Sequence, residues 1–325
     1  MAKEAGVDVS LVSRVLNNDE RAACRPETRE RILAVAARLH YRPHMAARGL
    51  KTARTMAFGM VVPDLSNVVY SAIAHGAESA AATAGYQLLV ASGLAGSRLR
   101  ELEGRIDGVL IGVATSETIG PEDFGGSMPK VLVNRREDWG IPSVVVDDEA
   151  GAALATRHLI ELGHTRLAHV SGPHVADTAR RRLQGFISAA RASGIEVGAT
   201  AIVEGGYDEP SGFTATRSLL QLRPRPTGIF VANIRGAMGA LAAIHSSGLR
   251  VPADVSIIGM HDVPLAAYLT PPLDTVRMPL EEMGRRAIDT LQFVIAGGEA
   301  EDSMVADLPE LVLRSSTGPP RRSGR

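Results

Sequence analysis

Short apolar runs alternate with helix-patterned segments along residues 55–325, and this alternation restricts the fold more than any other feature of the sequence. Runs rich in Val, Ile and Leu that are bounded by Gly, Pro, Asn or Asp indicate buried strands. Strands that alternate with helices form parallel sheets with helices on both faces. Residues 55–325 are therefore predicted to form doubly wound α/β lobes.

The same pattern gives the boundaries of the expected elements. Strands are expected at Met56–Val62, Tyr86–Ala91, Ile106–Ile111, Lys130–Val133, Ser143–Val146, Arg166–Ser171, Ala201–Glu204, Gly228–Val231 and Ser256–Met260. Helices are expected at Tyr70–Ala84, Gly151–Leu162, Thr178–Ser193, Pro210–Gln221, Ile234–Ser247 and Glu281–Ala296. Between Ser92 and Asp107 there is room for only a short, glycine-interrupted helix.

Residues 1–54 have the pattern of a small all-α head. Asp8 suits the N-cap of a helix that follows a tight turn at Gly6. The apolar residues of this helix recur at helical spacing, at Val12, Val15 and Leu16. Its other face carries the polar side chains of Ser10, Ser13, Arg14 and Asn17. Such a pair of helices is a helix–turn–helix, and a third helix is expected at Pro26–His40. A solvated helix pair without a ligand is the alternative.

Charge is divided unevenly between these two parts of the chain. Residues 1–54 hold eleven Lys and Arg against six Asp and Glu, whereas residues 55–325 hold twenty-four against thirty. A basic head on an acidic body is typical of a head that binds a polyanion such as DNA.

Composition also excludes several classes of protein. Cys24 is the single cysteine, so an internal disulfide framework is excluded and a cytoplasmic location is expected. The chain opens with Met-Ala-Lys-Glu and no apolar signal-peptide core follows. No uninterrupted apolar run approaches the ~18 residues that span a bilayer.

The sequence motifs of common enzymes on α/β folds are missing. There is no G-x-G-x-x-G after a strand, no Walker loop, no G-x-S-x-G elbow, no H-E-x-x-H and no cysteine pair for a metal. We therefore expect neither an enzyme nor a bound cofactor or metal.

Both parts of the chain resemble one family. The head and the segment after it contain AKEAGVDVSLVSRVLN, RPETRERI and LHYRPHMAARGL, which resemble the DNA-binding head and hinge helix of the lactose-repressor (LacI/GalR) family. The body contains HLIELGHTRLAHVSGP, VPADVSIIGMHD and AAYLTPPLDTVRMP, which resemble the effector domain of that family, a periplasmic-binding-protein-like pair of lobes. Against the family pattern, the sequence has a slightly short N-terminus and has Arg25 where a serine usually caps the third helix.

The resemblance implies a cytoplasmic, homodimeric, sequence-specific transcriptional regulator that represses by binding an operator in double-stranded DNA. A small-molecule effector between the lobes would control operator affinity. The alternatives are a periplasmic-type small-molecule binding protein and a regulator whose effector site has degenerated.

The resemblance also implies which residues contact DNA. Val9, Ser10 and Arg14 would face base edges, and Arg14 suits a bidentate contact with guanine. Phosphates would be held by Ser13, Asn17, Thr28 and Tyr41. The short hinge helix would contribute His44, Ala47 and Leu50. Because two helical turns are too few for a stable isolated helix, residues 44–50 are expected to be helical only on DNA, where Leu50 would enter the minor groove.

The implied effector site lies at the carboxyl ends of the strands, between the lobes. The resemblance assigns eight residues to it, namely Tyr70, Asn134, Thr178, Arg182, Tyr207, Asn233, His261 and Met278. Sugar-binding members carry carboxylates at the positions of Asn134 and His261. Arg182 offers a fork of donors, and together with His261 it would suit a carboxylate or a phosphate. A sugar, a sugar acid or a phosphorylated metabolite is the expected effector.

The expected domain organisation has four parts. The head covers residues 1–43, the hinge 44–54, and the effector and dimerisation domain 55–314. The first lobe would comprise about 55–146 and 276–304, and the second about 147–275 and 305–314. The chain would cross between the lobes near residues 145–148, 274–277 and 303–308. Residues 315–325, rich in Gly, Pro, Ser and Arg, are expected to be disordered.

Overall fold

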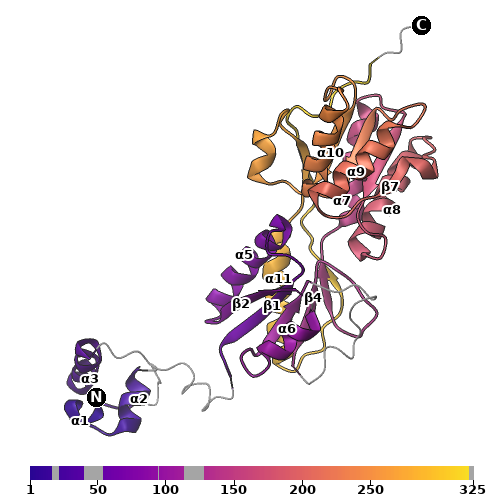
Figure 1. The fold of residues 1–325 in the computed structure, drawn as a ribbon. Helices are drawn as coiled ribbons and strands as arrows, with labels where there is room; N and C mark the ends of the chain where they lie inside the picture. Colours follow the sequence, from indigo (N-terminus) through magenta and orange to yellow (C-terminus); the bar gives the residue numbers. More distant parts are fainter. Residues whose placement is uncertain (17–21, 40–53, 94, 113–127, 322–325) are drawn as a thin grey trace. The chain divides into compact units, whose positions relative to one another are not determined.

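The computed structural model describes residues 1–16, 22–39, 54–93, 95–112 and 128–321. The chain forms two compact units, Met1–Met56 and Ala57–Arg325 (Figure 1). Among the described residues, no helix is both long enough and apolar enough to cross a membrane.

The first unit contains the expected helix–turn–helix. Helices α1 (Ala2–Ala5) and α2 (Val9–Leu16) are joined through Gly6, whose φ of 61° is left-handed. The Asp8 carboxylate accepts a hydrogen bond from the Ser10 backbone N–H at 2.7 Å and so caps α2. Helix α3 (Pro26–Arg38) follows. Its N-cap, Arg25, makes no side-chain capping hydrogen bond within the described part of the chain, as the missing serine predicts. The buried core of the unit comprises Ala5, Val12, Val15, Ala22, Ile32 and Val35.

The first lobe of the second unit is built on a six-stranded parallel sheet with the order β11-β5-β4-β3-β1-β2. The strands are β1 (Ala57–Val62), β2 (Gln87–Ser92), β3 (Gly108–Ile111), β4 (Lys130–Val133), β5 (Ser143–Val145) and β11 (Ser303–Met304). Side chains alternate across the sheet, because Phe58, Met60 and Val62 join one core cluster whereas Ala57 and Val61 join another.

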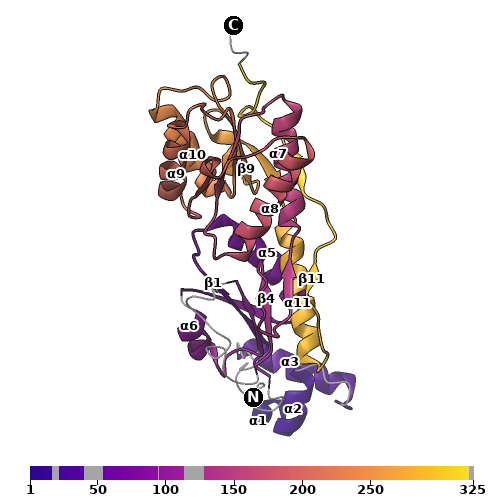
Figure 2. The ribbon, with the colours of Figure 1, turned by 90° about the vertical axis from the view of Figure 1, so that its right-hand side faces the viewer.

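Helices cover both faces of this sheet. Helices α5 (Val68–Thr83) and α11 (Leu280–Ile295) pack together on one face, and the short α6 (Ala95–Leu102) packs on the other. Figure 2 shows α11 beside α5, although most of the second lobe lies between them in the sequence. The two helices approach closely because each has a glycine at the crossing, Gly76 and Gly284.

The second lobe repeats this architecture with the strand order β12-β10-β9-β8-β6-β7. Its strands are β6 (Leu167–Ser171), β7 (Ile202–Glu204), β8 (Gly228–Val231), β9 (Ser256–Met260), β10 (Asp274–Arg277) and β12 (Glu310–Val312). All pairings are parallel except that of β10 with β12. The main helices are α7 (Asp148–Glu161), α8 (Asp177–Ala192), α9 (Glu209–Leu220) and α10 (Ile234–Ser246). Two doubly wound lobes and an α-helical head confirm the predicted fold class.

The chain passes between the lobes three times. Strand β5 of the first lobe leads into α7 of the second, β10 leads back into α11, and β11 is followed by β12. Each lobe is therefore built from segments that are distant in sequence.

The C-terminal segment is ordered where disorder was expected, so the prediction of a disordered tail from Ser315 is wrong for residues 315–318. Ser316 is buried, and its hydroxyl donates to the Ile257 carbonyl and accepts from the Asp274 N–H. His164 Nε2 lies 2.9 Å from the Gly318 carbonyl. Low apolar content suggested disorder, but the backbone of this segment is held by polar partners in the second lobe.

Candidate functional site

A cavity of about 210 Å³ lies between the two lobes, at the carboxyl ends of their strands. Seven of the eight residues assigned to the effector site line it, namely Tyr70, Asn134, Thr178, Arg182, Tyr207, Asn233 and His261. Met278 is not among the described residues that line the cavity. It is buried in the core, where its sulfur lies next to Gly151 of α7.

Asn134 and His261 occupy equivalent places in the two lobes. Asn134 follows β4 and His261 follows β9, and these two strands hold the same position in their sheets. Both residues have a left-handed backbone, with φ of 61° and 73°. This conformation is strained for a residue other than glycine and is frequent at functional sites. Both are also nearly inaccessible, at 7% and 1% relative exposure.

On the first lobe, a chain of hydrogen bonds ends at Asn134. The Tyr70 hydroxyl donates to the Gly112 carbonyl at 2.9 Å, and Asn134 donates to the Tyr70 oxygen. Burial raises the pKa of Tyr70 to about 12, so this hydroxyl keeps its proton at neutral pH. The Asn134 Oδ1 atom is buried and has no hydrogen-bond partner among the described residues.

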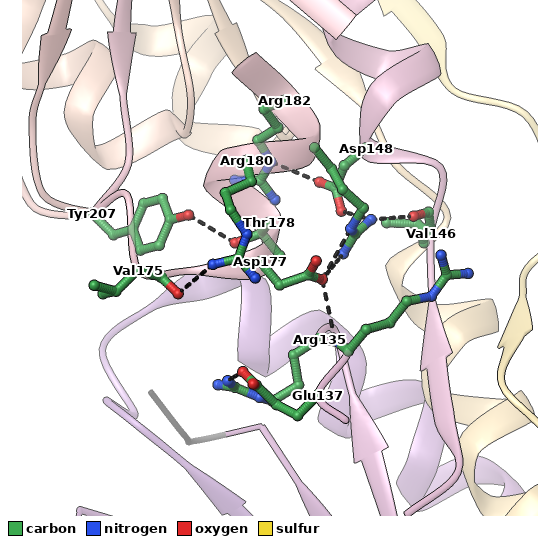
Figure 3. Close-up of polar contacts among 12 residues, drawn as sticks. Arg135, Glu137, Val146, Asp148, Val175, Asp177, Thr178, Arg180, Arg182 and Tyr207 are labelled. Atoms are coloured by element: carbon green, nitrogen blue, oxygen red, sulfur yellow. Dashed lines mark hydrogen bonds and ion pairs between the residues drawn. The ribbon is translucent and has the colours of Figure 1, made fainter. Parts of the chain in front are cut away.

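On the second lobe, Arg182 is held by three internal partners. Its Nε–H donates to Asp148 Oδ1 at 2.6 Å (Figure 3). One terminal nitrogen donates to the Ala232 carbonyl at 2.7 Å, and the other lies 3.2 Å from His261 Nε2. Arg182 and Asp148 are both buried, at 2% and 0% relative exposure. The N–H groups of Arg182, which were expected to be available to a ligand, are therefore largely occupied by partners within the protein. The Asp148 carboxylate neutralises the charge of Arg182.

His261 is a neutral imidazole with a defined tautomer. Burial and the nearby Arg182 lower its pKa well below the ordinary value of 6.5. Because a guanidinium can only donate, His261 Nε2 must accept from Arg182, which leaves the proton on Nδ1. The Nδ1 atom has no hydrogen-bond partner within the described ranges of the chain.

The remaining polar groups of the wall hold one another in place. The Tyr207 hydroxyl lies 2.7 Å from Thr178 Oγ1, toward which it points in Figure 3. Asn233 donates to the Tyr207 carbonyl and accepts from the Gly236 N–H, both at 2.9 Å, and so caps α10. The Arg182 guanidinium lies 5.9 Å from the centre of the Tyr207 ring. These contacts fix the position of the Tyr207 side chain in the wall.

Two glycines that sequence reasoning missed make room for the tyrosines. A Cβ at Gly112 would lie 2.7 Å from Tyr70 Cε1, and a Cβ at Gly172 would lie 2.3 Å from Tyr207 Cε1. Each glycine directly follows a predicted strand, which is the signal that could have identified it.

An ion-pair cluster at the cavity was also missed. Arg235 of the second lobe lies 3.0 Å from Asp64 Oδ2 of the first lobe and 2.7 Å from Glu209 Oε2 of its own lobe. The hydrogen bonds from Arg235 lower the pKa of Glu209. A second polar link joins the lobes, since the Arg136 N–H donates to Asp177 Oδ2 at 3.1 Å. Asp64 and Arg235 are 171 residues apart, so sequence spacing gives no signal for this pair.

One further cluster has the residue types of a catalytic triad. His174 lies 3.2 Å from Ser171 Oγ and 3.0 Å from Glu204 Oε2. Ser171 is only 1% exposed, however, and its hydroxyl donates to the Gly172 carbonyl. A buried hydroxyl engaged in this way is not available to attack a substrate.

In the head, α2 presents an exposed face. Val9 is 71% exposed, and Ser10 and Arg14 are exposed beside it, whereas Ser13 is half-buried. Thr28 is half-buried in the first turn of α3. The other residues assigned to DNA contacts lie outside the described residues, namely Asn17, Tyr41, His44, Ala47 and Leu50.

Comparisons with known proteins match both parts of the chain. The model of the lacI family of bacterial regulatory proteins matches residues 1–44, and that of the periplasmic binding protein-like domain matches residues 156–317. The chain is 32% identical to the HTH-type transcriptional repressor PurR of Photobacterium profundum, with 97% of each protein covered. It is 33% identical to the catabolite control protein A of Priestia megaterium, with 98% of each covered.

Solved structures give the same result. A Lac repressor dimer bound to operator and the anti-inducer ONPF matches with a TM-score of 0.84 and 29% identity, covering 98% of this chain and 97% of that one. A complex of the transcriptional regulator CelR with cellobiose matches with a TM-score of 0.74 and 30% identity, covering 97% and 98%.

A helix–turn–helix head followed by a two-lobed, periplasmic-binding-protein-like domain defines the class of DNA-binding transcriptional regulators that respond to small molecules. Within that class, the chain belongs to the lacI family of bacterial regulatory proteins. Members of this family are DNA-binding transcription factors rather than enzymes.

Proposed function

We propose that the chain is a cytoplasmic, homodimeric repressor whose affinity for a near-palindromic operator is controlled by a small molecule in the cavity between the lobes. The observation that carries this proposal is the presence, on one chain, of a family-matched DNA-binding head and a cavity lined by both lobes. A dimer with two-fold symmetry presents the same reading surface twice, which is why we expect a near-palindromic operator.

In this proposal α2 reads the operator. Val9, Ser10 and Arg14 share its exposed face, and the planar guanidinium of Arg14 can donate two hydrogen bonds to one guanine. Ser13 and Thr28 hold phosphates together with Asn17 and Tyr41. The hinge helix at residues 44–50 forms on DNA, where His44 and Ala47 contact the duplex and Leu50 enters the minor groove.

A surface of the first lobe supports dimerisation. Strand β2 is at the edge of its sheet, and Leu89 and Val90 on it are more than one-third exposed. Leu65 and Val68, before and at the start of α5, are exposed as well. An exposed apolar sheet edge favours association, and the Lac repressor neighbour is a dimer. We infer that a second copy of the chain covers this surface.

Control by a ligand requires that it bind one arrangement of the lobes more tightly than another. Residues from both lobes line the cavity, so a ligand there contacts both. The Asp64–Arg235 ion pair joins the lobes at the same place. A change in lobe closure would alter the dimer surface of the first lobe and so favour or melt the hinge helices.

The test uses two substitutions at one position. The operator is first selected from random DNA, and affinities are then measured by fluorescence anisotropy. Arg14→Ala should weaken binding and relax the preference at one base pair, by roughly 1–3 kcal/mol of discrimination. Arg14→Lys keeps the charge but loses the bidentate geometry, so it should relax the same preference with less loss of overall affinity. Unchanged base preference in both variants would exclude Arg14 as a reading residue.

A further inference from the structure

Two residues that line the cavity each carry a buried polar atom that nothing in the described part of the protein satisfies. Asn134 Oδ1 and His261 Nδ1 are buried and have no hydrogen-bond partner among the described residues, and the two residues line the same cavity from opposite lobes. Leaving such a group unsatisfied costs free energy comparable to a hydrogen bond, so native proteins rarely keep one without a use. Here two of them coincide with two strained backbones at equivalent strand ends.

The polarity of each group is fixed by its neighbours. The Gly112 carbonyl can only accept, so the Tyr70 hydroxyl donates to it and accepts from the Asn134 amide nitrogen. The Asn134 oxygen is therefore the free atom, an acceptor. On the other lobe Arg182 can only donate to His261 Nε2, so the free His261 atom is Nδ1–H, a donor.

The charges around the cavity disfavour an anion. The charged residues that line the cavity, together with every described residue linked to them through a continuous series of ion pairs, comprise three arginines and five carboxylates. The arginines are Arg181, Arg182 and Arg235, and the carboxylates are Asp64, Asp148, Asp177, Asp208 and Glu209. Two negative charges are thus in excess. A fully ionised carboxylate or phosphate group also has no donor of its own for Asn134 Oδ1.

We propose that the cavity binds an uncharged molecule that donates a hydrogen bond to Asn134 Oδ1 and accepts one from His261 Nδ1–H, and that this pair of bonds joins the lobes. This inference rests on the proposed function, in which the cavity holds the effector. It narrows the expected effectors, a sugar, a sugar acid or a phosphorylated metabolite, to the uncharged class, because Asp148 neutralises Arg182 and His261 is uncharged. Hydroxyl groups and cyclic amides both have the required chemistry.

The two free atoms can be removed without straining the backbone. Glycine is the residue best suited to a φ of 61° or 73°, so Asn134→Gly and His261→Gly should fold. Met56 also has a positive φ, of 57°, and is not among the described residues that line the cavity. Met56→Gly is therefore a matched control for the change in backbone freedom.

Isothermal titration calorimetry of the full chain without DNA tests the ligand class with matched probes. The pairs are ribose with ribose 5-phosphate, glucose with glucuronate, and uracil with orotate. We expect the neutral member of at least one pair to bind at least ~10-fold more tightly than its anionic partner. Each cavity glycine variant should weaken that binding about 10-fold, the value of one hydrogen bond, and Met56→Gly should not. Tighter binding of an anionic member, or binding insensitive to both cavity variants, would overturn the proposal.

A second measurement needs no ligand. In ¹⁵N-histidine-labelled protein, NMR should show His261 as the neutral Nδ1–H tautomer at pH 7, with its signals identified by their loss in His261→Gly. An Nε2–H tautomer or an imidazolium would overturn the assigned polarity. Neither experiment involves DNA, so failure to bind an operator would refute the proposed function and leave these results unaffected.

Discussion

The charge balance of the cavity can be tested by measuring how a substitution of Asp148 changes the free energy of unfolding. The Asp148 carboxylate is fully buried and lies 2.6 Å from Arg182 Nε and 2.5 Å from an Arg181 terminal nitrogen. Asp148→Asn keeps the shape of the side chain but removes the charge, which leaves Arg182 buried and uncompensated. Breaking a buried pair in this way costs about 3–5 kcal/mol, whereas replacing both partners by apolar groups is often close to neutral.

The assay is urea unfolding of the full chain, followed by circular dichroism and by the fluorescence of Trp139, the only tryptophan. We expect Asp148→Asn to lower the free energy of unfolding by about 3–5 kcal/mol. Adding Arg182→Met should recover most of this loss, because no unpaired charge then remains buried. Asp254→Asn is the control, since Arg250 and Arg321, which pair with Asp254, are about two-thirds exposed and such pairs contribute at most ~1 kcal/mol.

Two results would refute this reasoning. One is a loss for Asp148→Asn that does not exceed the loss for Asp254→Asn. The other is a double variant that is less stable than Asp148→Asn alone, which would show that Arg182 stabilises the second lobe without its partner.

Two further predictions concern the core. Burial lowers the pKa of His169 to about 4, so the folded protein holds it neutral whereas the unfolded chain gains a proton below about pH 6.5. The folded protein therefore has its full free energy of unfolding, as far as His169 is concerned, above pH ~6.5. Roughly 3 kcal/mol of this free energy is lost as the pH falls to 4. His169→Phe, between Phe186 and Phe230, should remove this part of the pH dependence in urea titrations, and an unchanged dependence would contradict the assignment. Gly76→Ala would place a Cβ 1.9 Å from the Glu281 carbonyl oxygen, so thermal unfolding should show a destabilisation of at least ~1–3 kcal/mol. Gly198→Ala, with open space around it, is the control, and equal stability of the two variants would contradict the close crossing of α5 and α11.

Much of the fold could be predicted from local pattern. Strands at Lys130–Val133, Gly228–Val231 and Ser256–Met260 have the predicted bounds, because a continuous apolar run specifies a strand buried on both faces. Strands β10, β11 and β12 were missed. Strand β10 has three polar residues out of four, β11 and β12 have only two or three residues, and all three are specified by the strands they pair with. The order of residues 315–318 likewise depends on Asp274 and Ile257, which are distant in sequence.

The sequence could predict which residues form the candidate site, but not which of their polar atoms remain without a hydrogen-bond partner. Seven assigned side chains line one cavity because the resemblance carries over their positions at strand ends. Which atoms remain available depends on contacts that single-sequence reasoning does not show. Asp148 neutralises Arg182, Arg182 fixes the tautomer of His261, and Tyr70 fixes the orientation of the Asn134 amide. From these contacts we infer that, of the expected sugar, sugar acid or phosphorylated metabolite, only the uncharged class suits the cavity.

The most direct test of ligand-controlled repression is operator affinity with and without a ligand that calorimetry shows to bind the cavity. Fluorescence anisotropy on the selected operator should show an affinity change of about 5–150-fold at saturating ligand, the range typical of coupled sites. The change should shrink in His261→Gly at the same ligand concentration, because less ligand is bound. An operator affinity that does not change when the cavity is occupied would contradict control of DNA binding by this site.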